Sequence, residues 1–141
     1  MSESVSRRQF LLQLAVLGGV SLLAPSCGHS DSSADWVSVG PGSGFQTGSF
    51  TLVTLADPSK DEVYITKHAD GSFLALSARC THRGCIIAWN PSLKTFRCPC
   101  HGGQFDQTGA VIGGPPPMPL PQMATKLDTQ GNLTVQIPKT V

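Results

Sequence analysis

Two short segments rich in cysteine and histidine could bind a metal. They read C-T-H-R-G-C over residues 80–85 and C-P-C-H-G-G over residues 98–103, and together they hold four of the five cysteines and two of the four histidines. Thiolates and imidazoles in this spacing could hold a tetrahedral zinc. They could equally hold a two-iron cluster with two cysteines on one iron and two histidines on the other. The candidate ligands are Cys80, His82, Cys98 and His101.

The same segments contain two more cysteines and three glycines. Cys85 and Cys100 remain once the two Cys/His pairs are assigned. Nearby cysteines in an exported protein are natural disulfide partners. Such a bridge would join one segment to the other. We expect Gly84, Gly102 and Gly103 to allow close backbone approach and to leave N–H groups free to donate to cluster sulfurs.

The chain around these segments is predicted to form short antiparallel strands. Apolar and β-branched runs separated by turn residues predict strands at 50–55, 62–67, 73–78, 86–89, 94–97, 110–112, 125–128 and 133–137. Asp70-Gly71 is a hairpin signal. Both metal-binding segments would then lie at the tips of a small antiparallel β-unit, and no long helical pattern follows residue 36.

Composition supports an all-β domain and excludes some functions. The chain has 141 residues, 15 glycines and 11 prolines, which indicates a turn-rich fold of short strands. Charged residues make up 13% and the formal net charge is +1, so the electrostatic signature of a nucleic-acid binder is missing. The sequence also has no nucleotide-binding fingerprint and no convincing nucleophile constellation.

The N-terminus is predicted to direct export. Residues 1–27 contain S-R-R-x-F-L, the twin-arginine signature, followed by an apolar run shorter than the roughly 20 residues that span a bilayer. The twin-arginine route exports folded proteins, which suits a cofactor inserted in the cytoplasm. Three outcomes fit this segment: lipid attachment at Cys27, cleavage near the same place, or retention as an anchor helix. Residues 28–35 form a polar linker, and the folded domain covers 36–141.

The two segments resemble the two metal-binding boxes of the Rieske [2Fe–2S] family, and the resemblance covers about residues 45–137. It implies a small antiparallel β-sandwich with an inserted cluster-binding subdomain at about 79–106. It also implies one [2Fe–2S] cluster per chain and a Cys85–Cys100 disulfide. The proline-rich segment at residues 114–121 resembles the loop that covers the cluster in this family. The implied iron ligands are Cys80 and Cys98 on one iron and His82 and His101 on the other, and the implied cover is Gly114, Pro115 and Pro116.

Two positions depart from the pattern of high-potential Rieske proteins. A serine usually follows H-G in those proteins, with a tyrosine two residues later, and both donate hydroxyl hydrogen bonds to sulfur. Here Gly103 and Phe105 stand in those places and have no hydroxyl. Sulfur that loses donors holds an added electron less well, so we expect a potential in the lower or middle part of the Rieske range.

The export signal and the resemblance together imply an electron carrier in the periplasm or on the outer face of the cytoplasmic membrane, which is catalytic only together with a partner. A cytochrome b-type quinol-oxidising subunit and a c-type cytochrome acceptor are the expected partners, as in a quinol–cytochrome c reductase. Two alternatives stay open: the small subunit of a molybdopterin enzyme resembling arsenite oxidase, and the Rieske ferredoxin of an oxygenase. A structural zinc or a purely disulfide-stapled lipoprotein is the alternative from outside the family.

Overall fold

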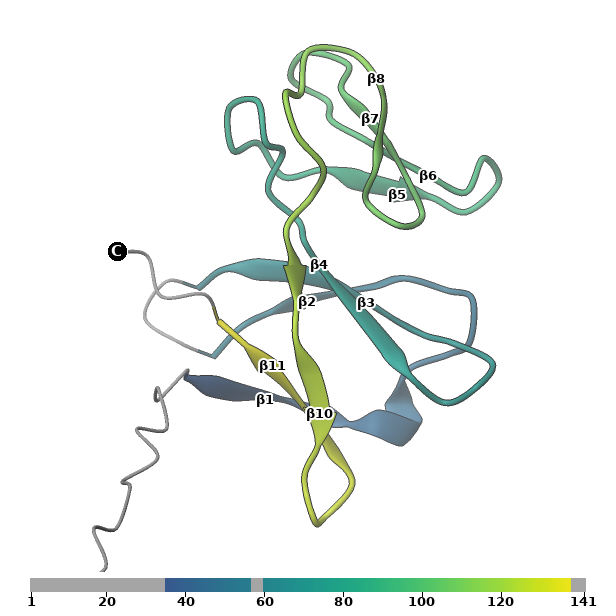
Figure 1. The fold of residues 1–141 in the computed structure, drawn as a ribbon, viewed down its shortest axis with the longest axis vertical. Helices are drawn as coiled ribbons and strands as arrows, with labels where there is room; N and C mark the ends of the chain where they lie inside the picture. The colour runs from purple at the N-terminus through teal and green to yellow at the C-terminus, as the bar shows by residue number, and fades with distance from the viewer. Residues whose placement is uncertain (1–34, 57–59, 138–141) are drawn as a thin grey trace, which may run out of the picture. The chain divides into compact units, whose positions relative to one another are not determined.

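The computed structural model describes residues 35–56 and 60–137, which contain eleven strands, one 3₁₀ turn and no α-helix (Figure 1). The predicted all-β fold is confirmed for these residues. The predicted export segment with Cys27, and the linker up to residue 34, lie outside them. Within the same residues, no helix is long and apolar enough to span a membrane. The elements are β1 (Trp36–Pro41), η1 (Gly42–Gly44), β2 (Thr51–Thr54), β3 (Glu62–Lys67), β4 (Phe73–Ser77), β5 (Ala88–Asn90), β6 (Thr95–Arg97), β7 (Gln104–Asp106), β8 (Val111–Gly113), β9 (Gln122–Met123), β10 (Thr125–Leu127) and β11 (Asn132–Gln136).

Two antiparallel sheets form the base of the domain. One has the strand order β1-β11-β10 and the other has the order β2-β3-β4-β9. Apolar side chains from both sheets meet in one core, as expected for the predicted β-sandwich. The buried members of this base core are Phe45, Leu55, Val63, Ile65, Ala75, Leu133 and Val135.

Strand β3 is buried on both of its faces. Because successive side chains of a strand point to opposite faces, Val63 and Ile65 enter the base core while Tyr64, between them, enters a second core. The four residues from Val63 to Thr66 are all buried. This pattern explains why the strand reads as a nearly continuous apolar and β-branched run.

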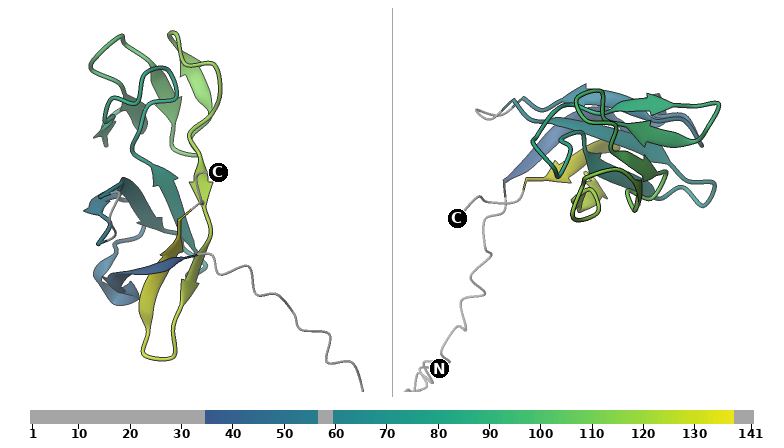
Figure 2. Two further views of the ribbon diagram at one scale, coloured as in Figure 1. Left: turned by 90° about the vertical axis from the view of Figure 1, so that its left-hand side faces the viewer. Right: turned by 90° about the horizontal axis from the view of Figure 1, so that it is seen from above.

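A third antiparallel sheet, in the order β5-β6-β7-β8, stands beyond the C-terminal end of β4 (Figures 1 and 2). The metal-binding segments adjoin its strands. We call this third sheet the cluster sheet. It extends to Gly113, beyond the expected limit near 106. Strand β7 was not predicted, because Asp106 begins a turn and the run before it holds one apolar residue. That residue, Phe105, pairs with Phe96 of β6, and both are completely buried.

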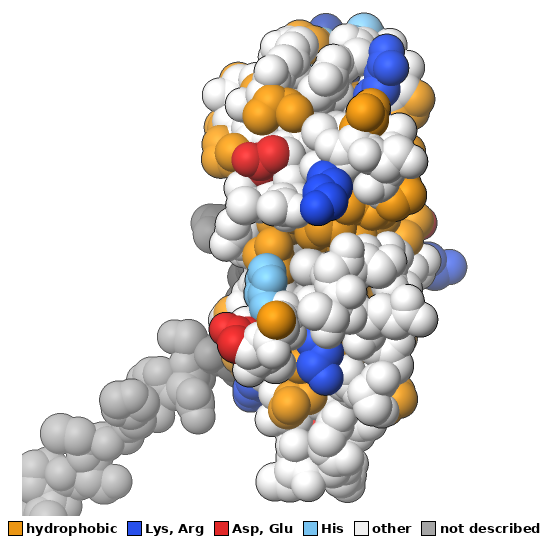
Figure 3. Space-filling model, turned by 90° about the vertical axis from the view of Figure 1, so that its right-hand side faces the viewer, with side chains coloured by type: hydrophobic (Ala, Val, Ile, Leu, Met, Phe, Trp, Pro, Cys, Tyr) orange, Lys and Arg blue, Asp and Glu red, His pale blue; other side chains and the backbone are white. Residues whose placement is uncertain are grey.

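Aromatic side chains join the cluster sheet to the base. Phe50 lies 4.5 Å from Trp89 and 4.9 Å from Phe96, measured between ring centroids, and Tyr64 lies 4.9 Å from Phe96. The Tyr64 hydroxyl donates a hydrogen bond to the Ile87 carbonyl at 3.0 Å. Figure 3 shows apolar side chains in a band across the middle of one face. These contacts fix the cluster sheet, and so the two metal-binding segments, on the base.

Candidate metal centre

The two metal-binding segments, loop 1 (residues 80–85) and loop 2 (98–103), have the same backbone hydrogen-bond pattern. In each loop the carbonyl of the first cysteine accepts from the residue four positions later. The N–H of that cysteine donates to the carbonyl five positions later. The two loops are therefore equivalent backbone turns, although the histidine stands two positions after the first cysteine in loop 1 and three positions after it in loop 2. The bonds are Gly84 N to Cys80 O at 2.7 Å, Gly102 N to Cys98 O at 3.1 Å, Cys80 N to Cys85 O at 2.8 Å and Cys98 N to Gly103 O at 2.7 Å.

This pattern corrects one expectation about the glycines. Gly84 and Gly102 have φ values of 72° and 70°, which explains why glycine stands at both positions. However, their N–H groups donate to backbone carbonyls and are not free for sulfur. The backbone N–H groups that hydrogen-bond the Cys80 sulfur are those of His82 and Arg83. Donors to that sulfur thus come from the residues two and three positions after Cys80.

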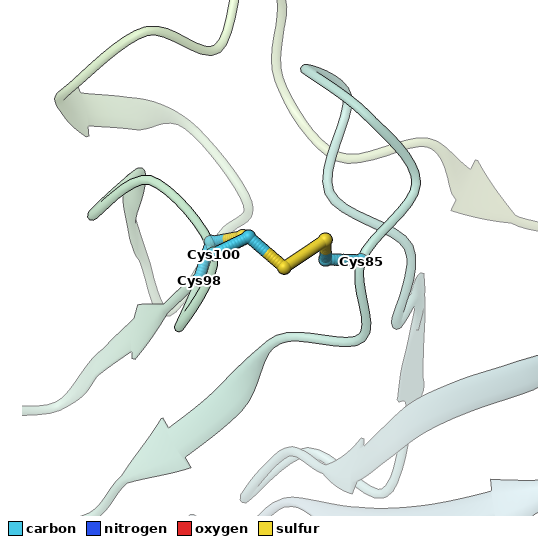
Figure 4. A group of neighbouring side chains, drawn as sticks. All are labelled: Cys85, Cys98 and Cys100. Carbon is cyan, nitrogen blue, oxygen red and sulfur yellow. A yellow bond between two sulfur atoms is a disulfide. The ribbon is translucent and has the colours of Figure 1, made fainter.

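A disulfide between Cys85 and Cys100 locks the loops together, with their Cα atoms 6.6 Å apart (Figure 4). The structure confirms this expected bridge. The sulfur of Cys98 lies beside it, and the three sulfurs are within 4.8 Å of one another. This trio is not itself a metal site, since two of its sulfurs are bonded to each other and are not thiolates.

The four candidate ligands form two pairs, each with one member from each loop. Cys80 and Cys98 are free, are 3% and 2% exposed, and lie close enough for their thiols to hydrogen-bond. The imidazole rings of His82 and His101 lie 4.9 Å apart between centroids. The structure thus places two thiols and two imidazoles of different loops in adjacent pairs.

Two observations show that a metal group fits here. Nδ1 of His82 is buried and has no hydrogen-bond partner among the described residues, an arrangement that is costly unless another ligand uses the nitrogen. The pKa of the Cys80 thiol is raised, chiefly by burial; the N–H groups of His82 and Arg83 act against this rise, and the thiol of Cys98 adds to it. A buried thiolate pair therefore needs a cation beside it.

The proline-rich segment packs against both loops. Thr81 of loop 1 donates its hydroxyl hydrogen to the Met118 carbonyl at 2.7 Å. A Cβ on Gly114 would lie 2.8 Å from Cα of Gly103 in loop 2, so the two backbones are in direct contact. Pro116 is buried whereas Pro115 is exposed. The hydrogen bond from Thr81 to the proline-rich segment was not predicted from the sequence. A hydroxyl placed between two candidate ligands is a signal of such a contact.

Comparison with known proteins gives one family. The profile of the Rieske [2Fe-2S] domain matches residues 35–124. The chain is 38% identical over 101 residues to the cytochrome b6-f complex iron-sulfur subunit of Chlorobaculum tepidum, covering 72% of this chain and 53% of that protein. It is 35% identical over 106 residues to the corresponding subunit of Synechococcus sp. WH7803, covering 73% and 55%. The chain thus spans about half the length of these curated relatives.

Solved structures share the fold. The plasma membrane Rieske protein of the cyanobacterium Synechocystis PCC 6803 is 30% identical, with a TM-score of 0.55 over 72% of this chain and 99% of that one. A chain of a hyperthermophilic respiratory complex III is also 30% identical, with a TM-score of 0.52 over 80% and 82%. Naphthalene 1,2-dioxygenase, at 20% identity and a TM-score of 0.58, shows a likeness of fold alone.

Proposed function

Because this chain belongs to the Rieske [2Fe–2S] family, we propose that it is an exported electron-transfer subunit of a quinol-oxidising membrane complex. One cluster per chain would be held by Cys80 and Cys98 on one iron and by His82 and His101 on the other. The observation that carries the proposal is that the disulfide-locked loops pair two buried free thiols and, separately, two imidazoles.

When bound, such a cluster supplies one-electron transfer, and its imidazole ligands raise the potential above that of an all-thiolate cluster. The residues of the chain do the remaining work. The disulfide holds the two loops together, and the aromatic contacts between the cluster sheet and the base hold them in place. The buried nitrogen of His82 is Nδ1, which leaves Nε2 for the electron donor; when Nε2 is deprotonated it can accept a hydrogen bond from a donor hydroxyl. The exposed side chain of His101 presents the second such site at the surface.

The partner is proposed to be a cytochrome b-type subunit, with a c-type cytochrome as acceptor. The curated relatives named above are subunits of cytochrome b6-f complexes, which supports this choice. Exposed apolar side chains in and before the proline-rich segment, Ile112 at 52% and Met118 at 57%, suit an apolar docking surface near the site. A molybdopterin subunit is the competing partner. We place the protein at the periplasmic face of the cytoplasmic membrane, reached by the twin-arginine route.

The cluster is tested with the full chain purified from its own membrane. We expect two irons and two acid-labile sulfides per chain, together with the EPR signal of a cluster with mixed Cys/His ligands. A protein that contains one zinc and no sulfide, or an EPR signal of all-cysteine type, would contradict the proposal. His68, which is exposed and outside both loops, gives a matched control. His68→Ala should keep the cluster, and His101→Ala should lose it.

The partner and the export route need separate experiments. Affinity purification after mild detergent extraction should recover a b-type cytochrome, identified by its haem spectrum. Recovery of a molybdopterin subunit in its place would move the protein to the competing class. Replacing both Arg7 and Arg8 by lysine should retain the protein in the cytoplasm, as measured by cell fractionation. Unchanged export would reject the twin-arginine route without affecting the cluster assignment.

A further inference from the structure

Gly103 is a glycine because of its neighbour, not because of its backbone. Its φ lies outside the left-handed region, unlike that of Gly102, so any residue could adopt its backbone conformation. Gly103 is buried, and a Cβ placed on it would lie 2.6 Å from Cγ and 3.0 Å from Cδ of Pro116. Real Cβ atoms almost never approach so closely. The Pro116 ring thus occupies the space that a side chain at position 103 would need.

Pro116 is pressed into this space by the segment around it. From Gly114 to Pro119 it is the one buried residue, and the other five are exposed. Contact between Gly114 and the loop 2 backbone fixes the segment before Pro116, and the hydrogen bond from Thr81 to the Met118 carbonyl fixes it afterwards. The contact is therefore set by constraints on both sides.

The ring lies next to a proposed iron ligand. A Cβ on Gly103 would lie 3.5 Å from Cβ of Cys98, so Pro116 fills the volume beside the Cys98 side chain. Proline has no N–H and its ring is apolar, so it offers that sulfur no hydrogen bond. Cys98 is 2% exposed, which leaves almost no access for water.

We propose that Gly103 and Pro116 form an interlock that keeps water and any side-chain donor at position 103 away from Cys98, and so holds the reduction potential of the centre down. The redox half of this proposal rests on the proposed function. The packing half does not, because it concerns contacts within the protein alone. The interlock also means that a hydroxyl at position 103 cannot be introduced unless Pro116 is made smaller.

The packing half is tested by a double-mutant cycle of thermal unfolding on the metal-free full chain. Gly103→Ala should lower the melting temperature by roughly 4 to 20 °C, as overpacking does in small domains. In a Pro116→Ala background the same change should cost far less. Gly113→Ala is the matched control, since its Cβ would meet nothing closer than 3.8 Å. An equal loss in both backgrounds, no loss in either, or a double variant that fails to fold would overturn the interlock.

The redox half is tested by potentiometric titration of the double variant Gly103→Ser with Pro116→Ala. With the ring removed, the serine hydroxyl has room beside Cys98, and the midpoint potential should rise above that of the wild type. Gly113→Ser should leave the potential unchanged. A double variant at or below the wild-type potential would overturn the redox half. A wild-type protein without iron would reject the proposed function instead, and the unfolding cycle would still decide the packing.

Discussion

Removing the disulfide should destabilise the domain by an amount that the loop length sets. The perturbation is the double variant Cys85→Ala with Cys100→Ala. The two cysteines are 15 residues apart in sequence, and closing a loop of that length restricts the unfolded chain by about 3 kcal/mol at 25 °C. Direct packing loss adds little, because Cys100 is exposed and Cys85 is half-buried. The melting temperature should therefore fall by roughly 10 to 25 °C.

The assay is urea and thermal unfolding of the metal-free chain, followed by circular dichroism. Reductant should lower the stability of the wild type to that of the double variant and should leave the double variant unchanged. The double variant is preferred to either single one, because a lone thiol beside Cys98 could enter the metal site as a wrong ligand. A double variant with the wild-type midpoint and m-value would refute the argument that the bridge acts through the unfolded chain.

Three further predictions concern single residues. His82→Ala should abolish cluster binding, whereas His68→Ala should not, as measured by iron content per chain. Thr81→Val should lower the free energy of unfolding by about 0.5 to 1 kcal/mol through loss of the hydrogen bond to Met118; an unchanged urea midpoint would argue against that tie. Burial acts to raise the pKa of Asp106, but hydrogen bonds from the following turn outweigh it, so the pKa is lowered. Asp106 therefore contributes stability above the pKa of the unfolded chain and loses it as pH falls through the folded pKa. Asp106→Asn should be less stable than the wild type at neutral pH, and urea midpoints in acid should converge; a constant difference would refute this.

Local sequence patterns were enough to single out the two loops and the disulfide that joins them. The spacing of the Cys/His pairs is a property of two short turns, and the predicted hairpin at Asp70-Gly71 brings β3 and β4 together as an antiparallel pair. The strand that leads into Cys80 was correctly predicted for the same reason. These features depend on neighbours in the chain, so a sequence pattern carries them.

Features set by distant contacts could not be predicted. Strand β1 contains Gly40 and ends at Pro41. It is a strand because it pairs with β11, which is a neighbour in space but lies far away in the sequence. Strand β7 depends on β6 and β8 on either side of it. The contact of Pro116 with Gly103 joins two segments that share no local signal, so only the folded structure shows why position 103 lacks a side chain.

Strand β3, buried on both faces, limits how the metal-binding part can be transplanted. The core beneath the cluster sheet contains Tyr64 and Leu76 from the base strands β3 and β4, and Leu120 from the returning segment. A fragment cut from Cys80 to Gly113 would keep every proposed ligand and lose these side chains. The domain is thus not a portable metal-binding cassette on an independent support, and grafting the loops onto another scaffold would require carrying β3 with them.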